Sequence, residues 1–182
     1  MAALESQVLN LNKGLVNFTH EVEKGGGENI SVCYQCGTCT GSCPMGRRNA
    51  LRTRKIMRMT ALGLKDDLLK DDSIWYCATC YTCTDRCPRH VKPTDVILAL
   101  RNMATRNLLA PKNFLQNATF IYQTGHAVPI NDATKKLRVK LGLKENPPTT
   151  HMYAEYMPGV QKILEATGMM AYKEQYEKEA KK

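Results

Sequence analysis

Apolar residues recur at about helical spacing between positions 45 and 76, and arginines largely occupy the other faces of the pattern. The apolar positions are Ala50, Ile56, Met57, Ala61 and Leu64. Only four β-branched residues fall in this stretch, which is rich in Arg, Met, Leu and Ala and therefore favours helix over strand. We predict a helix that ends at Gly63 and a short second helix over 65–70.

Helical patterns continue on both sides of this stretch. Val8, Leu11, Leu15, Phe18 and Val22 share one spacing, but Gly14 and three asparagines interrupt it, so we predict a helix over 17–24 alone. The glycines at 25–27 predict a flexible break. Pro93 predicts a helix start with Thr94 as its N-cap, and the helix continues to Pro111. Its apolar stripe comprises Val96, Leu100 and Met103.

Two further helices are predicted in the C-terminal third. Positions 131–141 indicate a basic helix closed by Gly142, and 146–149 indicate a loop. A second helix is predicted over 158–167, with Pro158 at its start and Gly168 after its end. The chain is therefore predicted to be all-α.

Composition narrows the class of protein. The 182 residues are 43% hydrophobic and 24% charged, which is typical of a globular protein and excludes disorder, collagen and coiled-coil arrays. No apolar run approaches the roughly 20 residues of a membrane span, and the first residues lack the features of a secretory signal. We expect a cytoplasmic protein in a compartment that keeps thiols reduced, with no membrane span.

The net charge of +9 raises the question of nucleic acid as a partner. Basic residues gather at 47–58 and at 135–140, and neither run is interleaved with aromatic residues or contains a groove-reading motif. We interpret both runs as solvated helix faces and expect no nucleic acid.

All eight cysteines lie in two segments, CYQCGTCTGSCP at 33–44 and CATCYTCTDRCP at 77–88. Each segment follows the pattern C-x2-C-x2-C-x3-C-P, and the second repeats the first after 44 positions. Cysteines at i, i+3 and i+6 can bind three corners of a cubane 4Fe-4S cluster from one short loop. In two-cluster ferredoxins, the last cysteine of each motif binds the other cluster. We therefore predict two 4Fe-4S clusters, one on Cys33, Cys36, Cys39 and Cys87, and one on Cys77, Cys80, Cys83 and Cys43.

Other uses of the cysteines fit less well. Structural zinc prefers two cysteine pairs separated by a longer loop, a disulfide framework needs secretion, and a catalytic thiol would stand apart from the repeat. Candidate hydrogen-bond donors to the sulfurs are Thr38, Thr40, Thr82 and Thr84, and the residues expected either to shield the clusters or to pack in the core are Tyr34, Trp75, Tyr76 and Tyr81. The histidines are expected to be ordinary polar residues: His20, His90, His126 and His151.

The motif pair, the helical connector and the phrase CYQCGTC at 33–39 together resemble the C subunit of the soluble CoB-CoM heterodisulfide reductases of methanogenic archaea, within the family of helical two-cluster ferredoxins. The resemblance is strongest over 17–110. It implies an alpha-helical ferredoxin domain that relays electrons from a flavin-containing subunit to another subunit that reduces the CoM-S-S-CoB heterodisulfide in methanogenesis. An associated hydrogenase or formate dehydrogenase would belong to the larger complex.

No cysteine follows Cys87, so we expect the disulfide-reducing chemistry to lie in another subunit, while this chain contains no catalytic residue. Two alternatives stay open: an iron-sulfur subunit of another dehydrogenase or fumarate-type reductase, and a zinc-stabilised basic binding module. We predict an N-terminal extension over 1–27, the dicluster domain over 28–110, and a helical C-terminal extension over 111–182. The Met- and Tyr-rich segment 150–176 of that extension is expected either to dock partners or to pack in the core.

Overall fold

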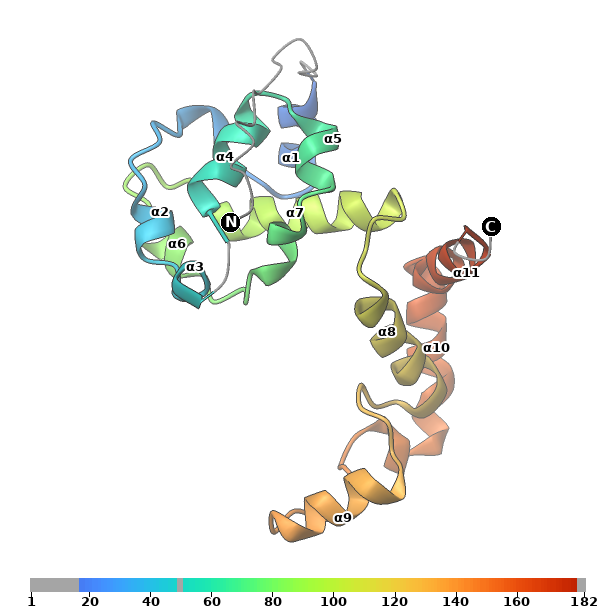
Figure 1. The fold of residues 1–182 in the computed structure, drawn as a ribbon. Coiled ribbons are helices and arrows are strands. Elements are labelled where there is room, and N and C mark those ends of the chain that lie inside the picture. The colour runs from blue at the N-terminus through green and yellow to red at the C-terminus, as the bar shows by residue number, and fades with distance from the viewer. Residues whose placement is uncertain (1–16, 49–50, 180–182) are drawn as a thin grey trace, which may run out of the picture. The chain divides into compact units, whose positions relative to one another are not determined.

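The computed structural model describes residues 17–48 and 51–179 of the chain. The regular structure in these residues is helical, with no strand, which confirms the predicted all-α class. The chain divides into two compact units, one reaching to Thr105 and the other starting at Arg106 (Figure 1). No helix in the described ranges is long and apolar enough to cross a membrane.

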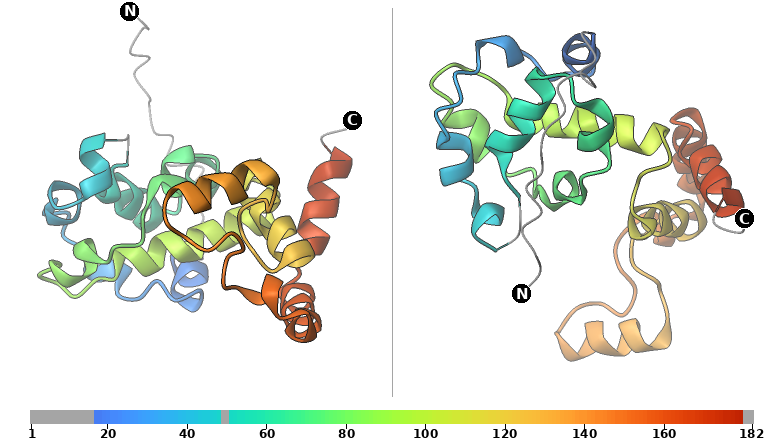
Figure 2. Two further views of the ribbon diagram at one scale, coloured as in Figure 1. Left: turned by 90° about the horizontal axis from the view of Figure 1, so that it is seen from below. Right: turned by 45° about the horizontal axis from the view of Figure 1, so that its top comes forward.

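The first unit gathers short helices around one long helix, α7, which Figure 2 shows from two sides. Its helices are α1 (Phe18–Lys24), η2 (Ile30–Val32), α2 (Thr38–Gly41), α3 (Pro44–Arg48), α4 (Thr53–Ala61), α5 (Lys65–Leu69), η3 (Asp72–Tyr76), α6 (Thr82–Asp85) and α7 (Pro93–Arg106). One hydrophobic core joins them, with Phe18 of α1, Ile56 of α4 and Leu100 of α7 all fully buried.

Helix α4 is amphipathic, as the sequence predicts, but its buried stripe differs from the predicted one. Ile56, Met57 and Met59 are buried, whereas Ala61 is exposed and Ala50 lies outside the described residues. Ala61 is the last residue of the helix and lies on its exposed side, whereas Leu64 beyond the helix is buried as predicted. The amides of residues 63 and 64 donate to the carbonyl oxygens of residues 60 and 59 at 3.1 Å, and Gly63 adopts a positive φ of 72°. This arrangement is a Schellman C-cap, and it confirms that the helix terminates at Gly63.

The glycines after α1 form a tight cap and not the flexible break that the sequence predicts. The amides of Gly26 and Gly27 donate to carbonyl oxygens of the last turn of α1 at 3.0 Å. A Cβ on Gly27 would lie 2.9 Å from side-chain atoms of both Val22 and Val96. Glycine is required here because the end of α1 packs directly against α7. The predicted helix over 17–24 is confirmed, and Val8, Leu11 and Leu15 lie outside the described residues.

The second unit contains α8 (Lys112–Thr124), α9 (Asp132–Lys140), η4 (Thr150–Met152), η5 (Ala154–Tyr156), α10 (Met157–Ala166) and α11 (Met169–Glu179). Helices α8, α10 and α11 pack against one another. Helix α9 begins at a reciprocal capping box between Asn131 and Thr134. The predicted helices over 131–141 and 158–167 are therefore confirmed to within a residue or two at their ends.

Helices α8 and α11 are not among the elements that the sequence predicts. Asparagines and threonines weaken the helical propensity of α8, and tertiary contacts hold it instead. The Tyr122 hydroxyl donates to Glu165 Oε1 at 2.8 Å, Gln161 donates to the Tyr122 carbonyl at 3.2 Å, and Leu115 is buried. The boundary between the two units falls between Thr105 and Arg106, at the C-terminal end of α7. The predicted three-part division, with boundaries after 27 and 110, stays a prediction.

Candidate metal centres

The eight cysteines line two separate small cavities of the first unit, and each cavity takes three cysteines from one motif and one from the other. The first cavity is bordered by Cys33, Cys36, Cys39 and Cys87, together with Arg54 and Met57. The second cavity is bordered by Cys77, Cys80, Cys83 and Cys43, together with Leu51 and Ile97. This grouping matches the two sets of four cysteines that the sequence predicts as ligands.

The two motifs share a backbone conformation as well as a sequence. Gln35 and Gly37 have φ values of 62° and 86°, and their counterparts Thr79 and Tyr81 have 51° and 60°. Non-glycine residues with positive φ are strained, and such strain concentrates at functional sites. One helical turn follows at equivalent positions, α2 in the first motif and α6 in the second, and these turns pack against each other. The repeat therefore places two similar cysteine loops side by side.

Threonine hydroxyls contact the two exposed cysteines. The Cys36 thiol lies 3.3 Å from Thr38 Oγ1, and the Cys80 thiol lies 3.5 Å from Thr82 Oγ1. When these hydroxyls donate to the deprotonated sulfur, they stabilise the thiolate and so lower the pKa of both cysteines. Thr38 and Thr82 are therefore positioned to form hydrogen bonds with cysteine sulfurs that are predicted cluster ligands.

The pKa is shifted in the opposite direction at two less exposed cysteines, Cys39 and Cys83. Burial raises the pKa of Cys39 to about 11 and also raises the pKa of Cys83. A bound cation would compensate for the burial of these thiolates, since metal binding and deprotonation of the ligand are coupled. Thr40 partly counters the burial of Cys39, and its Oγ1 also accepts a hydrogen bond from the Arg54 amide at 2.7 Å.

Thr94 has a different position from the predicted one. Helix α7 begins at Pro93, so Thr94 lies inside its first turn and is not the N-cap. Its buried hydroxyl lies 3.2 Å from the sulfur of Cys83 and accepts a hydrogen bond from Thr84 Oγ1 at 3.3 Å. The predicted capping role of Thr94 is therefore wrong, and its side chain instead borders the second cavity.

Three of the four aromatic residues near the motifs are exposed. Tyr34 is 60% exposed, Tyr81 42% and Tyr76 40%, so none of the three is a core residue. Trp75 alone is partly buried and packs against the hydrophobic core. Core packing is therefore wrong for the three tyrosines, whereas their shielding of the clusters stays a prediction.

Arg101 is the residue at the second motif that sequence reasoning missed. Its Nε donates to the Ile74 carbonyl at 2.9 Å, and its Nη2 donates to the Trp75 carbonyl at 3.1 Å and to the Cys77 carbonyl at 2.5 Å. The guanidinium also lies 5.7 Å from the centre of the Trp75 ring. One signal in the sequence could have identified Arg101: it is a charged residue beside Ile97 and Leu100, which are apolar and buried in α7. Arg101 fixes the chain where it enters the second motif.

The chemistry of the two sites fits iron-sulfur clusters. Each cavity offers four sulfur atoms, which is the ligand set of a cubane 4Fe-4S cluster. None of the four histidines, all of which are described, borders either cavity. Within the described ranges, no three His, Cys, Asp or Glu side chains converge on a point suited to one metal ion. That finding concerns single ions, whereas the ligands of a cubane surround a wider body of iron and sulfide.

Comparison with known proteins agrees with this chemistry. Residues 29–91 match the family of 4Fe-4S dicluster domains, which confirms the predicted cofactors and selects them over zinc. The C subunit of the H(2):CoB-CoM heterodisulfide,ferredoxin reductase of Methanothermobacter thermautotrophicus is 46% identical over 171 residues, 92% of each chain. The iron-sulfur C subunit of the CoB-CoM heterodisulfide reductase of Methanopyrus kandleri is 53% identical, over 74% of this chain and 70% of its own.

A third relative comes from another genus of methanogens. The C subunit of the ferredoxin:CoB-CoM heterodisulfide reductase of Methanosarcina mazei is 41% identical over 144 residues, 79% of this chain and 89% of its own. These relatives match most of the chain and not the cysteine motifs alone. The chain therefore belongs to the C-subunit family of CoB-CoM heterodisulfide reductases, whose members are iron-sulfur electron-transfer subunits of an oxidoreductase complex.

Proposed function

We propose that this chain relays electrons from a flavin-containing subunit to the subunit that reduces the CoM-S-S-CoB heterodisulfide. The observation that carries the proposal is the pair of four-cysteine cavities within a chain of this family. All eight cysteines line these cavities, so none is left over to reduce a disulfide substrate. This chain thus transfers electrons, and a partner subunit reduces the substrate.

In this proposal, Cys33, Cys36, Cys39 and Cys87 hold one 4Fe-4S cluster, and Cys77, Cys80, Cys83 and Cys43 hold the other. When bound, each cluster takes up and releases one electron at a time. Packing of α2 against α6 keeps the two cysteine loops adjacent. Cys87 borders the cavity of the first motif and Cys43 that of the second, so each motif contributes to both cavities. Adjacent, rigid sites are what an electron relay requires.

The complex is proposed to include the flavin-containing and the disulfide-reducing subunits and, in the larger assembly, a hydrogenase or formate dehydrogenase, and to be cytoplasmic. The second unit supports partner docking because large apolar side chains remain exposed on it. Those at least half exposed include Leu137, Val139, Leu141, Met152, Tyr153, Tyr156 and Ile163. Exposed apolar side chains that gather in a contiguous patch mark interaction sites. The sequence left open whether segment 150–176 docks partners or packs in the core. The exposure of residues 152–156 favours docking.

Anaerobic absorption and EPR spectra after dithionite reduction test the cofactors, and six serine variants test the ligand sets. Cys87→Ser should produce the same spectral loss as Cys36→Ser, whereas Cys43→Ser should produce the same loss as Cys80→Ser. The matched pairs identify each cluster without prior assignment of its signals. If Cys87→Ser instead resembled Cys80→Ser and Cys43→Ser resembled Cys36→Ser, each motif would hold its own cluster. Cys33→Ser and Cys77→Ser serve as further members of the two sets.

Anaerobic affinity purification of the tagged chain from its native host tests the partners. We expect flavin-containing and disulfide-reducing subunits to be recovered with it. Recovery with a quinone reductase or another dehydrogenase would instead favour the alternative iron-sulfur subunit. Single-turnover oxidation of the reduced chain by the recovered partner and the heterodisulfide then tests whether electrons flow in the proposed direction.

A further inference from the structure

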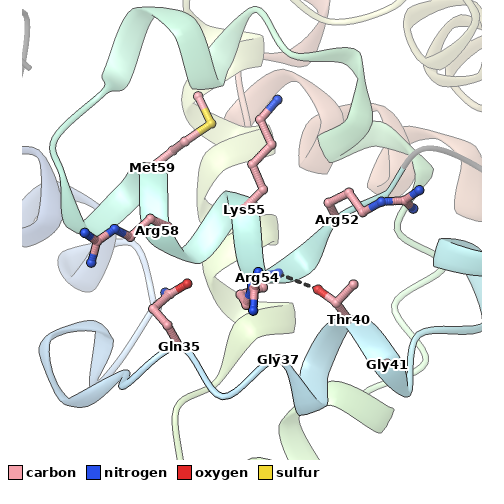
Figure 3. A pocket seen from close by; sticks show the side chains of 9 residues that line it. All are labelled: Gln35, Gly37, Thr40, Gly41, Arg52, Arg54, Lys55, Arg58 and Met59. Carbon is pink, nitrogen blue, oxygen red and sulfur yellow. Dashed lines mark hydrogen bonds between the residues drawn. The ribbon is translucent and has the colours of Figure 1, made fainter. Parts of the chain in front are cut away.

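A basic groove of about 690 Å³ lies on the first unit, against the loop that carries Cys36 and Cys39. Figure 3 shows its two walls: residues 35–41 form one, and helix α4 with Arg52 before it forms the other. Its lining residues are Gln35, Gly37, Thr40, Gly41, Arg52, Arg54, Lys55, Arg58 and Met59. Four of these side chains are cationic and none is acidic, so the lining of the groove carries a net positive charge.

Two of the four cations are committed within the chain. Arg52 donates to the Gly46 carbonyl at 2.9 Å, and Lys55 pairs with Asp71 at 3.3 Å. Arg54 and Arg58 are exposed and pair with no acidic side chain in the part of the chain that the structure describes. Their guanidinium groups are available to ligands that carry carboxylates.

Two backbone amides at the start of α4, beside the groove, are already used within the chain. Sites for small anions typically present free amides at a helix N-terminus or in a turn. Here the Arg54 amide donates to Thr40 Oγ1 at 2.7 Å, and the Ile56 amide donates to the Arg52 carbonyl. Recognition is left to long, mobile arginine side chains around an open groove, an arrangement suited to carboxylates on a protein surface. Gly41 leaves open space where a side chain would stand, so a partner's backbone could approach closely.

We propose that this basic groove is the docking site for an acidic surface segment of a redox partner protein. The inference deepens the proposed function, because it assumes that a partner exchanges electrons with this chain. Arg54 borders both the groove and the first cavity, so a segment that pairs with Arg54 would lie against the loop of Cys36 and Cys39. Docking there brings the partner beside the cluster proposed for that cavity.

Charge reversal of the two uncommitted arginines tests the proposal. The cluster-loaded chain and its Arg54→Glu/Arg58→Glu variant are titrated anaerobically against the purified flavin-containing and disulfide-reducing subunits, each immobilised in turn, at several salt concentrations. The matched control is Lys24→Glu/Lys70→Glu, which changes the net charge equally at exposed residues of the same unit outside both cavities and the groove. We expect the Kd for one partner to rise about tenfold to a hundredfold in the variant, with a shallower salt dependence.

Iron content, EPR signals and reduction potentials are measured on the same samples. Arg58→Glu alone provides a second variant, because Arg58 borders the groove but neither cysteine cavity. Weaker binding by Arg58→Glu, with both clusters retained and the control unchanged, would support the proposal. Unchanged Kd values for both partners would overturn it, as would a change in reduction potential alone, because the arginines would then serve only to compensate cluster charge. If the unaltered chain held two clusters but bound neither partner, the proposed function itself would fail.

Discussion

Replacement of Arg101 by methionine should clearly destabilise the first unit. Methionine keeps the apolar stem of the side chain but removes three hydrogen bonds, to the carbonyl oxygens of Ile74, Trp75 and Cys77. Burial lowers the pKa of Arg101, because desolvation disfavours its charge. These bonds therefore keep a partly buried cation in place, and their loss removes the protein partner of three carbonyl groups.

The magnitude follows from the number of bonds. A hydrogen bond to a charged group contributes about 1.5–3 kcal/mol. Only the Ile74 residue is buried, whereas Trp75 and Cys77 are partly exposed and their carbonyls can regain water. The net loss should therefore be equivalent to one or two such bonds, about 3 kcal/mol. In a unit of this size, that loss lowers the melting temperature by roughly 12–24 °C.

The assay is the anaerobic thermal midpoint of cluster loss, followed by visible absorption at a fixed heating rate. Arg106→Met is the matched control, since Arg106 is exposed on the same helix. Arg101→Lys should fall between the two, because lysine keeps the charge but cannot reach three carbonyls from one planar group. If Arg101→Met melted with the unaltered chain, or if Arg106→Met lowered the midpoint equally, the assignment of Arg101 as the clamp of the second motif would be refuted.

Three further substitutions test other parts of the structure. Thr94→Val removes the hydroxyl beside Cys83 and should lower the reduction potential of one cluster only, measured by EPR-monitored redox titration; equal shifts of both clusters would contradict this. Gly27→Ala inserts a Cβ into a space that lacks room for it and should cost about 1–3 kcal/mol in thermal stability, whereas Gly159→Ala, in open space, should not destabilise. Asn131→Ala removes the N-cap of α9 and should cost about 1 kcal/mol, seen as roughly fivefold faster hydrogen exchange in that helix. Asn131→Asp keeps a capping side chain and is the control, so equal exchange rates in the Ala and Asp variants would argue against the cap.

The sequence determined the chemistry of this protein because the cysteine motifs are local. Three cysteines within seven residues must lie on one loop, and the 44-residue repeat requires two such loops with similar backbones. Helical periodicity likewise located α4, since an amphipathic helix has its buried face encoded in its own spacing, and Pro93 located the start of α7. The family resemblance and the cofactors followed from the same residues.

Tertiary structure decided the features that depend on residues distant in sequence. Helix α8 has weak intrinsic propensity and exists because α10 and α11 pack against it. Thr94 resembles a cap until the fold brings Cys83 to its hydroxyl, and Arg101 resembles a surface residue until the chain before Cys77 crosses α7. The basic groove forms only where residues 35–41 face the exposed arginines of α4. A pattern along the chain records what a segment must bury, but it does not record which other segment completes the contact.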